Sequence, residues 1–111
     1  MEYKIKSRIW IEVDGEILLG EGRVQLLKAI AETGSLTKAA ASLSMSYKKA
    51  WSLVDAVNTR AKKPVVNTSI GGTKGGGTEL TEYGRTLIKI FDNLNENCWT
   101  FLDEQLANSE L

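Results

Sequence analysis

The segment Gly34-Ser-Leu-Thr-Lys-Ala-Ala-Ala-Ser-Leu-Ser-Met-Ser-Tyr-Lys-Lys-Ala-Trp-Ser52 contains two helix starts separated by a short interruption. Ser35 is a good N-cap for a short helix, which we predict from residue 36 to residue 43. Ser46 caps a longer helix, which we predict from residue 47 to about residue 62, with Pro64 ending it. The segment is therefore predicted to be a helix-turn-helix. Apolar residues recur at helical spacing on the inner faces, namely Leu36, Ala39, Ala40, Leu43, Ala50, Leu53, Val54, Val57 and Ala61.

Before this segment, the sequence predicts a β-hairpin and one further helix. Apolar and charged residues alternate from Ile5 to Val13, as in a strand with one buried face. Asp14-Gly15 favours a two-residue turn, after which residues 16–19 form the returning strand. A helix follows from residue 21 to residue 33, with Gly34 as its terminator. Its inner face is predicted to hold Val24, Leu26, Leu27, Ile30 and Ala31.

After the helix-turn-helix, the sequence predicts a wing, which is a β-hairpin with a long loop. Residues 65–70 and 78–80 have strand character, and the glycine-rich residues 71–77 join them. Thr81 is then predicted to cap a long final helix. This helix has more apolar surface than one small domain needs, carried by Leu87, Ile88, Ile90, Phe91, Leu94, Cys98, Trp99, Phe101, Leu102 and Leu106.

Together these elements predict one domain over residues 1–111, mainly α with a small β part (α+β), in the form of a winged helix-turn-helix. The expected parts are a β-hairpin at 1–19, a three-helix core at 21–63, the wing at 64–80 and a C-terminal dimerisation helix at 81–111. A content of 42% hydrophobic and 25% charged residues is ordinary for a globular domain of this length.

The formal net charge is zero, but the charges are unevenly distributed. Seven basic residues and one acid between residues 35 and 77 give a local charge of +6, whereas residues 78–111 carry −5. Phosphate binding depends on local charge, so a basic centre beside an acidic helix is compatible with nucleic-acid binding. The sequence contains neither the apolar run of a signal peptide nor a membrane span, so we expect a cytoplasmic protein without membrane association.

The composition gives little support to catalysis, metal binding or cofactor binding. The chain has no histidine and one cysteine, Cys98, which excludes an internal disulfide and a Cys/His metal site. We interpret Cys98 as a helix-packing residue, because no activating base is evident beside it. The glycine loop lacks the lysine spacing of a P-loop, so a nucleotide site is not expected. The sequence therefore predicts no enzyme and no cofactor.

The polar start of the longer helix is the best candidate for reading DNA. A recognition helix needs small residues for close packing and cationic or polar side chains in its first turns. Lys48, Lys49 and Ser52 lie away from the inner face, whereas we interpret Tyr47 and Trp51 mainly as a packed aromatic pair. In the wing, glycines allow the backbone to approach phosphate closely, and a loop without function is the alternative. The complete predicted set of DNA contacts is Ser35, Thr37, Lys38, Ser46, Tyr47, Lys48, Lys49, Ser52, Thr73 and Lys74.

These residues resemble the N-terminal DNA-binding domain of ModE-type molybdate-responsive transcription regulators. The resemblance rests on the segment quoted above, on Asn58, on Gly71-Gly-Thr-Lys-Gly-Gly-Gly-Thr-Glu-Leu-Thr81 and on Gly84. The segment also resembles, more distantly, the LysR-type winged helix. That family shares the Ala-Ala pair and a Leu-Thr-x-x-Gly run after the wing. The resemblance implies a bacterial or archaeal homodimer, linked to molybdenum metabolism, that places one recognition helix per subunit on a palindromic operator in double-stranded DNA.

ModE regulators also carry C-terminal oxyanion-binding domains, and this chain stops at Leu111, about where such domains would begin. We therefore expect no small-molecule effector site within these residues. The expected function is that of a dimeric, sequence-specific transcription regulator. The predicted dimer contacts lie on the final helix and are Leu87, Phe91, Leu94, Cys98, Phe101 and Leu102.

Two alternatives remain open at this point. In the first, the protein is an interaction module on a winged-helix scaffold, and the apolar stripe of the final helix binds another protein. In the second, the glycine loop binds an oxyanion such as molybdate.

Overall fold

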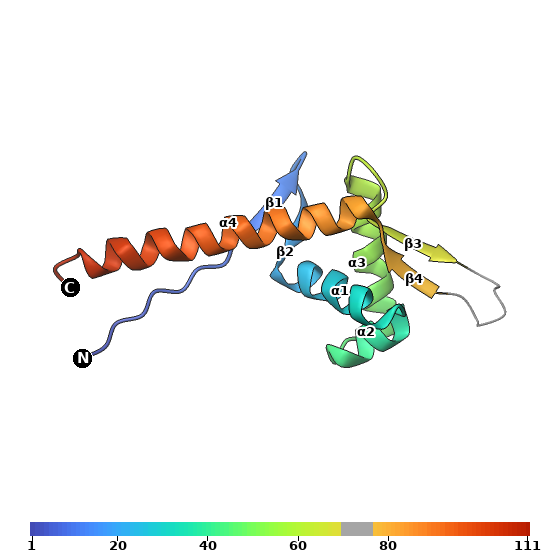
Figure 1. Ribbon diagram of the computed structural model, residues 1–111, viewed down its shortest axis with the longest axis horizontal. Coiled ribbons are helices and arrows are strands. Elements are labelled where there is room, and N and C mark those ends of the chain that lie inside the picture. The colour runs from blue at the N-terminus through green and yellow to red at the C-terminus, as the bar shows by residue number, and fades with distance from the viewer. Residues whose placement is uncertain (70–76) are drawn as a thin grey trace.

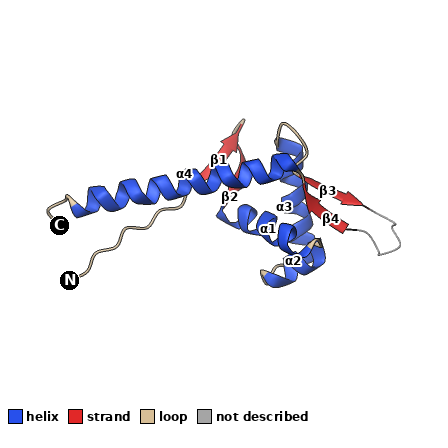
Figure 2. Cartoon of the chain, viewed as in Figure 1, coloured by secondary structure: helices blue, strands red, loops and turns tan. Residues whose placement is uncertain are grey.

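The computed structural model describes residues 1–69 and 77–111. Figure 1 shows one long helix that crosses the domain and extends well beyond the other elements. Figure 2 shows that helices dominate and that the strands form two separate two-stranded hairpins. The fold is a winged helix-turn-helix with an N-terminal hairpin, as the sequence predicts. In chain order the elements are β1 Trp10–Val13, β2 Glu16–Gly20, α1 Glu21–Thr33, α2 Leu36–Ser42, α3 Tyr47–Arg60, β3 Val66–Ser69, β4 Gly77–Leu80 and α4 Glu82–Ala107.

The N-terminal hairpin is shorter than the sequence pattern indicates. β1 begins at Trp10, so the prediction of a strand from Ile5 onward is wrong for residues 5–9, which carry no regular secondary structure. These residues run beside α4, where Ser7 Oγ lies 3.7 Å from Cys98 Sγ (Figure 1). Side chains alternate in any extended chain, so the period of two reports an extended segment whether or not it joins a sheet.

The local signals at the turns and helix ends are confirmed. Asp14 and Gly15 both have positive φ values, 51° and 80°, as the predicted two-residue turn requires. Gly34 ends α1 in the left-handed conformation, with its N–H bonded to the Ile30 carbonyl at 2.8 Å. The hydroxyls of Ser35 and Ser46 cap α2 and α3. α2 ends one residue earlier than predicted and α3 about two residues earlier, which is within the usual uncertainty of helix ends.

The core is built around α1, which contacts α2, α3, α4, β2 and β4. Ala39, Ala40 and Ala50 are at most 2% exposed, so small side chains do bring α2 and α3 close to the core. The predicted inner position of Ala31 is wrong: Ala31 is exposed, and Ala29 is buried in its place. Because α1 has neighbours on several sides, its buried face is wider than a single stripe. The fully buried large side chains are Leu19, Leu26, Leu27, Ile30, Val57 and Val65.

The wing consists of β3 and β4, paired antiparallel from Val66 opposite Leu80 to Ser69 opposite Gly77. β4 is attached to the end of α1, because the Thr78 N–H donates to the Gly34 carbonyl at 3.1 Å. The predicted continuation to Ile70 and the loop residues 71–76 lie outside the described residues. Gly77, which was predicted to belong to the loop, is the first residue of β4. In the described part of the chain, no helix is both long and apolar enough to cross a membrane.

Candidate nucleic-acid interface

The first turns of α3 present polar side chains to solvent. Ala50, Val54 and Val57 are buried against the core, which fixes the rotation of the helix. Lys48 and Ser52 lie about opposite to this buried face, since successive residues are rotated by about 100° around a helix. Both are exposed, as is Lys49 on the flank, and none of the three side chains has a polar partner among the described residues. These three groups are therefore free to bind a ligand.

Ser35 and Ser46 already have structural roles. Ser35 Oγ accepts from the Lys38 N–H and Ser46 Oγ accepts from the Lys49 N–H, each at 3.1 Å. Thr37 and Lys38 are exposed on α2. A capping serine still has its hydroxyl proton to donate, so capping does not exclude a phosphate contact.

Tyr47 and Trp51 are 55% and 53% exposed on the surface of α3. They lie on the flank of α3 that also carries Asn58. Trp51 is therefore a candidate contact residue that the sequence analysis left out of the predicted site. The available signal was its position four residues after Tyr47, which places both aromatic side chains on one flank of the helix beside the exposed lysines.

Part of the local positive charge is already engaged within the protein. Arg60 Nη2 lies 3.3 Å from Glu16 Oε2, and Lys63 Nζ lies 5.7 Å from the centre of the Tyr83 ring. The exposed cations of this stretch without a polar partner among the described residues are Lys38, Lys48, Lys49 and Lys62. The net charge of +6 along the sequence therefore overstates what the surface offers to a phosphate backbone in the described residues.

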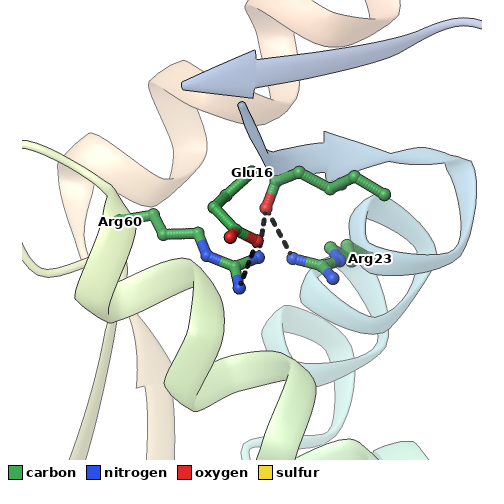
Figure 3. A network of polar contacts seen from close by, with 4 residues as sticks. Glu16, Arg23 and Arg60 are labelled. Atoms are coloured by element: carbon green, nitrogen blue, oxygen red, sulfur yellow. Dashed lines mark hydrogen bonds and ion pairs between the residues drawn. The ribbon is translucent and has the colours of Figure 1, made fainter. Parts of the chain in front are cut away.

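The first hairpin is attached to α3 by a network of arginines (Figure 3). The Ile17 carbonyl accepts from Arg23 Nη1 at 2.8 Å and from Arg60 Nη1 at 2.7 Å. Burial, and secondly the charge of Arg60, lower the pKa of Arg23 from its ordinary value. One carbonyl oxygen thus holds two cations, which fixes β2 against both α1 and α3.

The wing is attached to the opposite flank of α3 by Asn58. Its Oδ1 accepts from the N–H groups of Val65 and Val66 at 2.8 and 3.0 Å, and its Nδ2 donates to the Val66 carbonyl at 3.0 Å. The predicted wing contacts Thr73 and Lys74 lie outside the described residues. What the structure describes is the base of the wing, which these three hydrogen bonds hold beside α3.

The predicted dimer residues fall into three environments. Leu87 and Phe91 are buried in the core of the domain, and Cys98 and Leu102 are half-buried. Only Leu94 and Phe101 are freely exposed, at 46% and 59%. Ile90 lies one turn before Leu94 and is similarly exposed, so the uncovered apolar stripe of α4 consists of Ile90, Leu94 and Phe101.

Within residues 1–69 and 77–111, no cluster of three or more Asp, Glu, His or Cys side chains could hold a metal ion. Cys98 is half-buried beside Ser7, in the packed position that the sequence predicts.

The helix-turn-helix and the wing lie in a segment that matches a known protein family. Residues 22–85 match the bacterial regulatory helix-turn-helix proteins of the lysR family, which covers more than half of the chain. This family consists of regulatory proteins, which confirms the prediction that the chain is not an enzyme. The match extends from α1 through the wing into the first turn of α4.

Three curated relatives are similar to the chain over 72–97 residues. The molybdenum transport protein ModE of Azotobacter vinelandii is 37% identical over 97 residues, 87% of this chain and 36% of the relative. The molybdenum-pterin-binding protein MopB of Rhodobacter capsulatus is 45% identical over 73 residues, 66% and 27% of the two chains. The DNA-binding transcriptional dual regulator ModE of Escherichia coli is 40% identical over 72 residues, 65% and 28%. The chain thus spans about a third of the length of these relatives.

Proposed function

Because the chain belongs to the lysR family of bacterial regulatory helix-turn-helix proteins, we propose that it is a transcription regulator that reads DNA with α3. The observation that carries this proposal is the exposed face of α3, where Lys48, Lys49 and Ser52 have no polar partner among the described residues. Lysines at the start of a recognition helix bind phosphates or guanine edges, and a serine hydroxyl bonds to several base edges. Ser35, Thr37, Lys38, Ser46 and Tyr47 flank these groups. Thr73 and Lys74 are proposed to reach the backbone from the wing.

The experiment combines a selection from random duplexes with a binding titration. The selection identifies the preferred operator, for which we expect two inverted half-sites roughly 10 base pairs apart. Fluorescence anisotropy then compares the wild type with the Lys48→Ala, Lys49→Ala double variant at several salt concentrations. Loss of two phosphate contacts should make the slope of log K against log salt shallower by about 1.8.

A matched control removes the same charge elsewhere. Lys4 and Lys6 are exposed on the N-terminal segment, and the Lys4→Ala, Lys6→Ala double variant should bind DNA like the wild type. Unchanged affinity of the α3 variant at low salt would show that α3 is not the recognition helix. A protein that is monomeric, does not bind DNA and co-purifies with a larger protein would favour the alternative of an interaction module.

We also propose that the protein is a homodimer joined through the uncovered stripe of α4. Apolar side chains at Ile90, Leu94 and Phe101 repeat along one side of a helix that projects beyond the domain (Figure 1). Burying such a stripe against a second copy removes it from water and pairs two recognition helices by a two-fold axis. Light scattering should give twice the chain mass for the wild type. The Leu94→Asp, Phe101→Asp variant should give the monomer mass.

The control for this experiment uses the same helix. Trp99 is exposed on α4 and lies about 140° around the axis from Leu94, so Trp99→Asp should leave the dimer intact. Circular dichroism of each variant checks that α4 remains helical. A monomeric wild type at micromolar concentration would contradict the proposal.

The target genes are proposed to belong to molybdenum metabolism, because the relatives carry ModE names or a molybdenum-pterin-binding name. Because bacterial promoter DNA lies in the cytoplasm, we propose that the protein acts there. Chromatin immunoprecipitation should enrich promoters of genes for molybdate uptake or use of the metal. Enrichment of unrelated promoters only would remove the link to molybdenum and leave the DNA-binding proposal standing.

A further inference from the structure

A groove separates the first hairpin from α3 on the flank of α3 that faces away from the wing. It has a volume of about 570 Å³. Its walls come from the strand segment around β1, from the start of α1 and from the first half of α3. The residues that matter here are Arg8, Trp10, Glu21, Arg23, Met45 and Lys49.

The groove carries an excess of positive charge. Arg8, Arg23 and Lys49 line it together with a single acid, Glu21. The exposed side chains of Arg8 and Lys49 form no hydrogen bond or ion pair with another described residue. The Arg23 guanidinium uses Nη1 to bond the Ile17 carbonyl and lies near the second guanidinium, that of Arg60 (Figure 3). An anion in the groove would therefore find two free cations and the field of a third.

The position of the groove relative to α3 indicates which kind of anion it would bind. The major groove of B-DNA is about 12 Å wide, and a helix with its side chains is about 10–12 Å across, so both flanks of an inserted helix come close to a phosphate strand. The wing lies on the Asn58 flank of α3, where its proposed contacts are to one strand. Lys49 lies on the other flank and opens into the groove.

We propose that this groove binds a backbone phosphate of the DNA strand opposite to the wing, with Arg8 and Lys49 as the contacting residues. This inference rests on the proposed function and extends it to the N-terminal segment, which the family match at residues 22–85 does not include. Phosphate contacts position a protein on the duplex without reading sequence. Arg8 therefore orients α3 in the major groove and does not select the operator.

The test is the salt dependence of binding by the Arg8→Ala variant of the full chain. Removal of one phosphate contact should make the slope of log K against log salt shallower by about 0.9. The loss of affinity should accordingly be about 3.5-fold larger at 50 mM salt than at 200 mM salt. The loss should be equal on the operator and on a scrambled duplex, because a phosphate contact carries no sequence information. Arg8→Lys keeps the charge and should retain the wild-type slope.

Lys4→Ala provides the matched control, because Lys4 is an exposed cation of the same segment and does not line the groove. Its slope should equal that of the wild type. If the wild type binds DNA and Arg8→Ala leaves the slope unchanged, the inference is wrong while the proposed function stands. If the wild type binds no DNA, both fail. Calorimetry with inorganic phosphate covers the other source of this anion: saturable binding lost in Arg8→Ala, with an unchanged DNA slope, would assign the groove to free phosphate and overturn the inference.

Discussion

Replacing Asn58 by alanine tests how strongly the wing is attached to α3. The Asn58 side chain makes three hydrogen bonds of 2.8–3.0 Å to the backbone of Val65 and Val66. Val65 and Val66 are 0% and 3% exposed, so water has little access to the backbone groups that the alanine would leave unpaired. The variant therefore removes the bonds without offering those groups another partner.

The expected loss follows from these bonds. A net contribution of about 1 kcal/mol each gives a fall of about 3 kcal/mol in the free energy of unfolding, and the buried unpaired groups act in the same direction. For a domain of this size, a change of that magnitude corresponds to a fall in Tm of roughly 10–20 °C. Urea denaturation followed by far-UV circular dichroism, at one protein concentration for all variants, measures the loss.

Asn93→Ala is the matched control for this substitution. Asn93 is exposed on α4 and has no side-chain hydrogen bond with another described residue, so its replacement should change stability by less than about 0.5 kcal/mol. If Asn58→Ala loses no more than this control, the three bonds do not hold the wing and the reasoning fails.

Two further substitutions test the junction between the wing and α4. In Gly84→Ala, the new Cβ would clash with the Val65 carbonyl oxygen. Thermal denaturation should therefore show a fall of about 1–3 kcal/mol in the free energy of unfolding, although alanine has the better helix propensity. A neutral or stabilising result would contradict the close approach. Thr81 Oγ1 accepts from the Gly84 N–H at 2.9 Å and donates to the Pro64 carbonyl at 2.7 Å, so Thr81→Ala should lose about 1–2 kcal/mol in a urea titration. Thr81→Ser keeps the hydroxyl, and equal losses in the two variants would speak against the cap.

The elements that the sequence predicts correctly depend on short-range physics. Helix caps, the left-handed turn at Asp14-Gly15 and the glycine that ends α1 each involve groups a few residues apart, so residue identity is sufficient to predict them. The strand predicted from Ile5 fails for the opposite reason. Strand pairing needs a partner, and β2 has only the length to pair with residues 10–13. The preceding residues instead lie on α4, which is about 90 positions away in sequence at Ser7 and Cys98.

The candidate site likewise has a part that the sequence predicts and a part that depends on tertiary packing. The 3.6-residue period indicates that Lys48 and Ser52 face outward, because only the buried stripe of α3 is needed for that prediction. The period cannot indicate which apolar residues of α4 remain uncovered. Leu87 and Leu94 belong to the same predicted series, yet Leu87 is buried in the domain and Leu94 lies beyond it. That difference depends on where the neighbouring elements end, as does the presence of Arg8 and Lys49 in one groove.

The two side chains that hold the flanking hairpins come from α3 itself. Asn58 bonds the wing and Arg60 bonds the first hairpin, and two residues along a helix differ by about 200° in direction, so the hairpins are held on opposite flanks. Both attachments lie in the last turn of α3, whereas Lys48, Lys49 and Ser52 lie in its first two turns. One half of the helix thus sets the positions of the elements proposed to contact phosphates, and the other half stays free to enter the major groove. A substitution at Asn58 or Arg60 should therefore weaken DNA binding without touching DNA, by letting one flank move relative to the recognition face.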